Sequence, residues 1–128
     1  MNNKDIFKSA SALGGGIGLT TKSGCGALTG AAMVISQIAG RDLDNIEDPE
    51  RSRFVAYRLG QRLVNKFIEQ YGTTSCEKIQ EQLMGRSFNM YEEWDAMMAA
   101  GGHSTACTTV VGNVTKWATE IIDELQKK

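Results

Sequence analysis

The fold of this chain is organised around residues 14–30, which read GGGIGLTTKSGCGALTG. Glycine has no side chain, so a loop this rich in glycine can turn tightly and approach other groups closely. The loop leads into an apolar stretch at residues 24–39, which predicts a buried helix. We expect Ser23 to cap this helix. We also expect Gly26 and Gly30, four positions apart, to let a neighbouring helix backbone pack closely.

The rest of the chain has helical periodicity and helix-end signals, and no segment alternates as a strand does. The strongest pattern lies in residues 49–71, where Asp48-Pro49 marks a start and apolar residues recur every four positions. Ser104 is the expected cap of the last helix. The further predicted helices are residues 3–12, 76–84, 91–100 and 105–126. The sequence therefore predicts an all-α, single-domain helical bundle over residues 1–128, with about four main helices and a short N-terminal helix within residues 1–13.

Composition sets limits on the class of function. The 128 residues carry 14 basic and 15 acidic side chains, a net charge of -1, so no overall field favours nucleic acid. No apolar run is long enough to span a bilayer, so we expect no membrane insertion. Three cysteines are an odd and modest number, which favours a reducing, cytoplasmic location. A redox partner protein and a homo-oligomer both stay open as partners.

The three cysteines share a position along the chain. Cys25, Cys76 and Cys107 each fall in the first turn of a predicted helix, where backbone N–H groups and the helix dipole favour a thiolate. If the helix starts meet, these residues are candidate catalytic thiols and metal ligands. His103, four residues before Cys107, is a candidate fourth ligand or a base for that thiol. Small buried cysteines and a solvated loop histidine are the alternatives.

One family combines these features. The segment Cys25–Gly30, CGALTG, follows a glycine-rich loop and precedes two widely spaced cysteines, and this order resembles the C-GCAxxG-C-C family. The resemblance runs from Gly14 to Cys107. It implies an α-helical domain with clustered cysteines and a redox role, through a bound metal or iron–sulfur centre. Gly24 and Gly26 flank Cys25 and are the residues expected beside such a cofactor.

The chain departs from the family pattern at its first cysteine. That pattern has four cysteines, the first upstream of the glycine-rich loop, and no cysteine precedes Cys25 here. Either the beginning of the chain is missing or this member lacks a ligand. A site of Cys25, Cys76 and Cys107 with His103, water or a partner chain is then one alternative. A redox disulfide between two of the three cysteines is the other.

Two other readings come from different classes of function. Residues 16–23 nearly match the phosphate-binding pattern GxxxxGK[ST], but Thr21 replaces the second glycine and no strand is predicted before them. A non-catalytic interaction module is suggested by methionine and aromatic residues within residues 84–98, which suit an adaptable surface. Packing of the same methionines beneath a loop is the simpler explanation.

Overall fold

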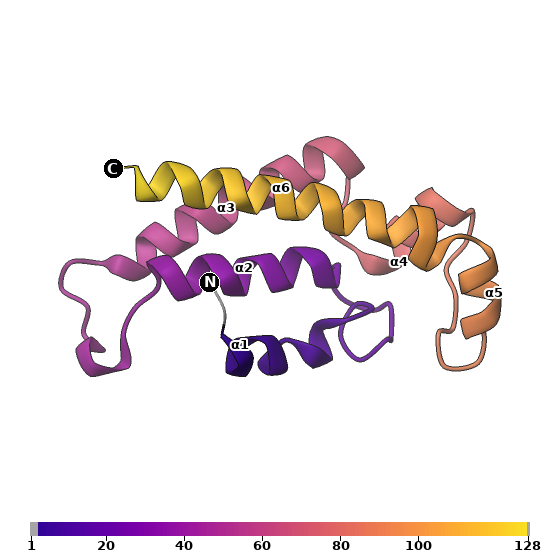
Figure 1. Cartoon of the computed structure of the whole chain (residues 1–128), viewed down its shortest axis with the longest axis horizontal. Helices are drawn as coiled ribbons and strands as arrows, with labels where there is room; N and C mark the ends of the chain where they lie inside the picture. Colours follow the sequence, from indigo (N-terminus) through magenta and orange to yellow (C-terminus); the bar gives the residue numbers. More distant parts are fainter. Residues whose placement is uncertain (1–2, 128) are drawn as a thin grey trace.

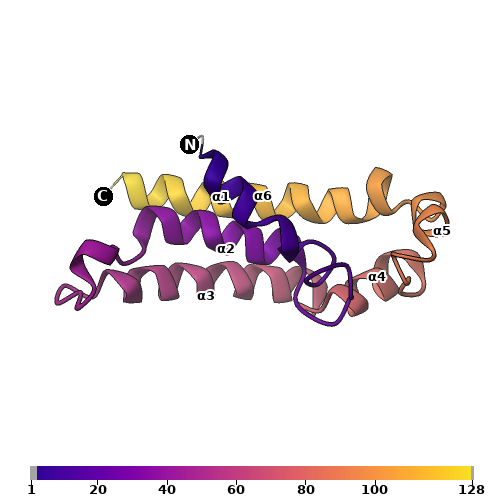
Figure 2. The same cartoon turned by 90° about the horizontal axis from the view of Figure 1, so that it is seen from below.

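The computed structural model describes residues 3–127 and confirms the predicted all-α class. Three long helices lie side by side along the length of the molecule, while the shorter helices flank them (Figures 1 and 2). The long helices are α2 (Gly26–Ala39), α3 (Ser52–Tyr71) and α6 (Cys107–Gln126). The short ones are α1 (Lys4–Ser9), α4 (Cys76–Met84) and α5 (Trp94–Ala99). Among residues 3–127, no helix is both long and apolar enough to cross a membrane.

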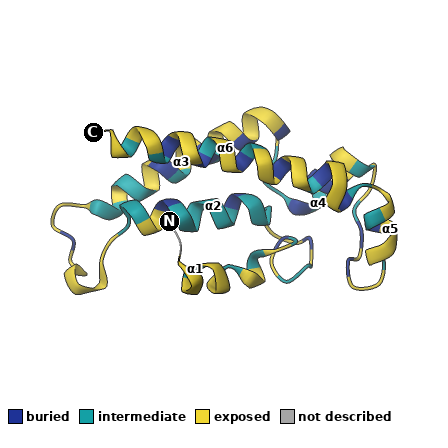
Figure 3. Ribbon diagram, viewed as in Figure 1, coloured by how far each residue is buried: buried dark blue, intermediate teal, exposed yellow. Residues whose placement is uncertain are grey.

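The main core lies where α2, α3 and α6 meet. On α3 the four-residue ridge is confirmed, because Leu59, Leu63, Phe67 and Tyr71 are all buried. The inner faces of α2 and α6 complete this core, whose buried residues appear as dark bands along the three long helices (Figure 3). Val111 of α6 lies outside this core and is 51% exposed.

A second, sulfur-rich cluster lies at the α4–α5 end of the molecule. Its buried members are Cys76, Phe88, Met90 and Met97, and Cys107 packs against them. Met84 and Met98 also pack against this cluster. The predicted packing of these methionines beneath a loop is therefore confirmed. The cluster is formed by α4, α5, the connection between them and the start of α6.

Helices α2, α3, α5 and α6 each begin two or three residues after their predicted positions. Helix α2 begins at Gly26 and has no side-chain cap, so the prediction that Ser23 caps it is wrong. Helix α3 begins at Ser52, three residues after Pro49, because Arg51 adopts a left-handed conformation that interrupts the helix. Asp48 still caps α3 from a distance. Its carboxylate accepts hydrogen bonds from the backbone N–H of Ser52 at 2.8 Å and of Arg53 at 3.0 Å.

Helix α4 agrees with the sequence most closely, whereas α5 (Trp94–Ala99) is shorter than the predicted residues 91–100. Helix α4 has its predicted bounds, and the Ser75 side chain caps it by accepting a hydrogen bond from the N–H of Lys78. Helix α6 begins at Cys107 rather than residue 105, and Ser104 does not cap it. One turn of π-helix, Gly102–Ala106, precedes α6 and carries the chain into it. The N-terminal segment, predicted as one helix, consists of α1 and a short 3-10 turn at Ser11–Leu13.

The glycine-rich loop forms a left-handed turn. Five consecutive residues, 15–19, have positive φ, and Thr21 follows with φ 60°. The N–H of Gly18 donates to the carbonyl of Ala12 at 2.8 Å, and the N–H of Thr21 donates to that of Gly15 at 2.9 Å. A non-glycine residue in this conformation costs about 1–2 kcal/mol, so Ile17 strains the loop. The strained turn is held in place by contacts to α4 and to the α4–α5 connection.

Candidate functional site

Two of the three cysteines are brought together by a short piece of antiparallel backbone pairing. Gly24 and Ser75 form an isolated bridge. The N–H of Cys25 donates to the carbonyl of Thr74 at 2.8 Å, and the N–H of Cys76 donates to that of Ser23 at 3.0 Å. Ser23, the predicted cap, therefore accepts from the cysteine of another helix. The bridge fixes the starts of α2 and α4 side by side and carries one thiol on each.

Cys76 is enclosed by the glycine loop on one side and by its own helix on the other. A Cβ atom placed on Gly16 would lie 2.8 Å from the Cβ of Cys76, so only glycine leaves room for this thiol. The buried Gln80, one turn along α4, donates from its amide nitrogen to the Cys76 sulfur at 3.9 Å and to the Met90 sulfur at 3.6 Å. Its oxygen accepts a hydrogen bond from the N–H of Phe88 at 3.0 Å.

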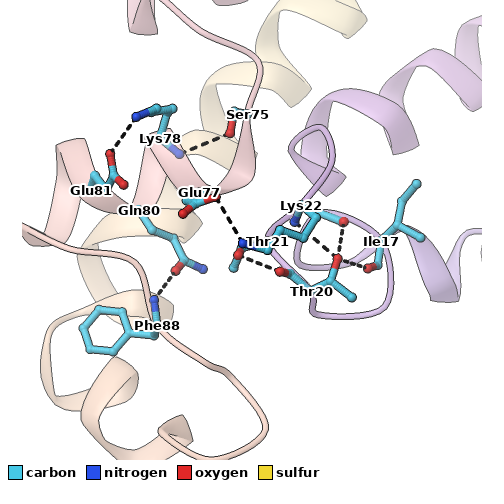
Figure 4. Close-up of polar contacts among 11 residues, drawn as sticks. Ile17, Thr20, Thr21, Lys22, Ser75, Glu77, Lys78, Gln80, Glu81 and Phe88 are labelled. Atoms are coloured by element: carbon cyan, nitrogen blue, oxygen red, sulfur yellow. Dashed lines mark hydrogen bonds and ion pairs between the residues drawn. The ribbon is translucent and has the colours of Figure 1, made fainter.

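Side-chain contacts attach the loop to the elements around the thiols. Lys22 forms an ion pair with Glu77 of α4 at 3.7 Å, and Figure 4 shows this contact together with Gln80 beside Phe88. The hydroxyl of Tyr91 donates to the carbonyl of Gly18 at 2.6 Å. The loop, α4 and the α4–α5 connection thus support one another around the buried sulfur.

All three cysteines and His103 line one cavity of about 410 Å³. Cys107 lies at the start of α6, half-buried like Cys25, while Cys76 is only 8% exposed. His103 lies in the π-turn before α6, and its ring meets Trp94 edge-on with centroids 5.1 Å apart. The remaining wall is mostly apolar: Leu19, Ala27, Ile79, Met90, Met97, Val110 and Val111.

The electrostatics of the thiols reverse the prediction from helix starts. Burial raises the pKa of Cys76 from 9.0 to about 11, and charges at Cys25, Cys107 and Glu77 raise it further. Burial also raises the pKa of Cys107, with a smaller contribution from charge at Cys25. The predicted lowering of pKa is therefore wrong at these two positions, because the loss of hydration outweighs the helix dipole. At neutral pH both side chains are thiols.

The same residues do not converge on a metal or cluster site. Within residues 3–127, no three His, Cys, Asp or Glu side chains come close enough together to hold one metal ion. Cys25, Cys76, Cys107 and His103 surround a cavity instead of meeting at a point. This arrangement does not fit a preformed metal or iron–sulfur centre, and no step below depends on one.

The glycines near Cys25 have different surroundings. Gly26 is in close contact with backbone, because a Cβ there would lie 2.8 Å from the carbonyl oxygen of Leu13. Gly30 has nothing within 4 Å of such an atom, so the predicted close approach holds at Gly26 alone, and to a loop rather than a helix. Gly24 belongs to the bridge. The role of Gly24 and Gly26 beside a cofactor stays a prediction.

Sequence reasoning missed the residues that enclose the thiols. Gln80 follows Cys76 by four positions on a predicted helix, a spacing that places both on one face. That spacing could have identified Gln80. Gly16 offered no comparable signal, because its contact with Cys76 joins segments far apart in the sequence. The contact between Trp94 and His103 crosses the end of α5, so helical spacing does not indicate it.

Comparison with protein families adds one finding to this geometry. Residues 1–121 match a family model described as "Putative redox-active protein (C_GCAxxG_C_C)". No curated protein and no solved structure matches the chain.

Proposed function

The chain belongs to the C-GCAxxG-C-C family, and from this premise we propose that it exchanges electrons by thiol–disulfide chemistry, with Cys25 and Cys107 as the redox pair. The observation that supports this proposal most is the common cavity, which three cysteines from three helix starts line together. Shared cavity walls put thiols within reach of one substrate molecule. The family description supports a redox role, and the three cysteines in the cavity wall support thiols as the redox groups.

Accessibility favours this pair over the two others. Cys25 and Cys107 are both half-buried, so a substrate in the cavity can reach either sulfur. Cys76 is buried, covered by Gly16 and bonded by Gln80.

The proposed reaction is a two-electron exchange with a disulfide-containing substrate. One protein thiol loses its proton and attacks a substrate sulfur, which forms a mixed disulfide and releases one substrate thiolate. The second protein thiolate then attacks the protein sulfur of that mixed disulfide and releases the second substrate thiolate. The released thiolates take up the two protons. Cys25 and Cys107 are thereby oxidised to one disulfide, and the substrate disulfide is reduced to two thiols.

His103 and Cys76 have supporting roles in this proposal. His103 is exposed at the cavity and has the chemistry to accept the proton of Cys107, whose pKa burial raises. Cys76, with its pKa near 11, stays protonated and packs the cavity floor. His103→Gln would slow the attacking step at neutral pH and leave the rate at high pH unchanged, because there hydroxide deprotonates the thiol.

Disulfide mapping tests the pair directly. Diamide, which takes two hydrogens from a dithiol, is added to dilute anaerobic protein, and free thiols are counted after unfolding. We expect the count to fall from three to one, with a Cys25–Cys107 link in the non-reducing peptide map. The Cys76→Ser variant should form the same link, whereas Cys25→Ser and Cys107→Ser should form no internal disulfide. A link through Cys76, or three thiols surviving in the folded protein, would refute the pair.

A further inference from the structure

Among the described residues 3–127, none that lines the cavity is a carboxylate, a lysine or an arginine. Its titratable side chains are the three cysteines and His103, which lies at the exposed edge beside Trp94. The pKa of Cys76 and that of Cys107 are both raised, so these thiols are uncharged at neutral pH. The side chains in the interior of the cavity therefore offer no charge that would compensate an ion on a bound molecule.

The polar group nearest the buried thiol is already engaged. The amide nitrogen of Gln80 donates to the sulfurs of Cys76 and Met90, and its oxygen accepts from the N–H of Phe88. In residues 3–127, no buried side-chain nitrogen or oxygen lacks a hydrogen-bond partner. A charged or strongly polar ligand would exchange water for an apolar wall and would find no unpaired buried side-chain partner there, which is costly.

We propose that the substrate of this cavity is an uncharged, apolar disulfide, and that anionic disulfides are discriminated against by the wall itself. This inference rests on the proposed thiol–disulfide function and specifies its substrate class. The volume of about 410 Å³ suits a small molecule, since such pockets measure about 300–1,000 Å³. At the mouth, Val111 and Trp94 expose apolar surface, 51% and 39% of each residue, which an apolar substrate would cover.

Bound there, the substrate would follow the exchange already balanced above. The thiolate of Cys107 or Cys25 attacks one sulfur of the apolar disulfide, and the leaving sulfur departs as a thiolate that takes up the proton. The partner cysteine then displaces the second half. An apolar leaving group gains no stabilising cation from the cavity, so the selectivity arises when the substrate binds and not when its bond breaks.

Two chromogenic aromatic disulfides of opposite character provide the test. Dithiodipyridine is uncharged at neutral pH, and dithiobis(nitrobenzoate) is a dianion. The rate at which each reagent reacts with the thiols of the whole protein is measured by stopped flow, for the folded protein and for the protein unfolded in urea. The ratio of the two rates in urea corrects for the intrinsic reactivity of the reagents. We expect folding to raise the ratio of the uncharged to the anionic reagent by about tenfold or more, the scale of electrostatic effects on encounter.

A charge at the mouth gives a matched variant. Val111→Lys places a cation on an exposed position of the wall, and Thr115→Lys places the same cation one turn further along α6, outside the cavity. We expect Val111→Lys to lower the ratio about tenfold and Thr115→Lys to leave it within about twofold. A folded ratio equal to the urea ratio, or equal effects of the two lysines, would overturn the substrate class. Disulfide mapping with diamide distinguishes failure of the substrate class from failure of the redox pair. A normal Cys25–Cys107 link without substrate selectivity would overturn the substrate class alone.

Discussion

Gly16→Ala gives the sharpest test of how the glycine loop supports the buried thiol. Gly16 has φ +71°, and a Cβ there would lie 2.8 Å from the Cβ of Cys76, 3.0 Å from the carbonyl oxygen of Ser23 and 3.0 Å from the Cα of Thr21. Two costs follow. Alanine in a left-handed conformation costs about 1–2 kcal/mol, and forcing an extra methyl group into a packed site costs about 1–3 kcal/mol. We therefore expect destabilisation of about 2–5 kcal/mol.

Gly18→Ala is the matched control for the conformational cost. Gly18 lies in the same turn with φ +62°, and nothing lies within 4 Å of a Cβ placed there. Gly18→Ala should therefore lower the free energy of unfolding only by the cost of the left-handed conformation, about 1–2 kcal/mol. Urea unfolding followed by circular dichroism measures both free energies, and the difference between the variants isolates the contact with Cys76. Equal losses would refute the reasoning, because they would show that the loop does not press on the thiol.

Three more predictions follow from the loop, the α3 cap and the buried thiol. Ile17→Gly should stabilise the protein by about 1 kcal/mol, because Ile17 is strained at φ 69° and its side chain is 47% exposed. Ile68→Gly, at a helical position that is 45% exposed, should destabilise it by a similar amount. Urea unfolding midpoints of the two variants and the wild type measure both changes. The backbone N–H of Arg53 above all holds the pKa of Asp48 at about 2, below its usual 3.8, so the stabilisation is present above pH 3.8 and lost as the pH falls through 2. Asp48→Asn should therefore be less stable than the wild type at neutral pH and converge with it near pH 2, and a constant gap would contradict this account. Alkylation of Cys76 by iodoacetamide at neutral pH should be roughly a hundredfold slower in the folded than in the unfolded chain, since its pKa rises from 9.0 to about 11; equal rates by peptide mass analysis would disprove the shift.

The helices themselves could be predicted because their signals are local. The ridge that ends in Tyr71 and the bounds of α4 follow from spacing and from caps within a few residues. The predicted helix starts were less accurate where the capping side chain lies several residues before the helix. Asp48 caps α3 across the left-handed Arg51, and no pattern in the sequence announces that conformation.

The site could be predicted only in part. The positions of the three cysteines at helix starts hold at Cys25, Cys76 and Cys107, since each lies at the first residue of a helix or just before it. Their pKa could not be predicted, because burial depends on tertiary packing and outweighs the local dipole. The left-handed turn could not be predicted from the sequence either. It places Ile17 and Thr21 where local preference disfavours them, and contacts from distant segments hold it.

The bridge between Gly24 and Ser75 also constrains the order of folding. It closes a chain segment of 51 residues (75 − 24), which contains all of α2 and α3. Closing a long loop costs chain entropy that two hydrogen bonds alone do not repay, so the packing of α2 on α3 must come first. The starts of α2 and α4, and with them two of the thiols, are then aligned late. A nascent or partly unfolded chain would keep Cys25 and Cys76 apart, and the proposed thiol site would be assembled only in molecules in which α2 has already packed on α3.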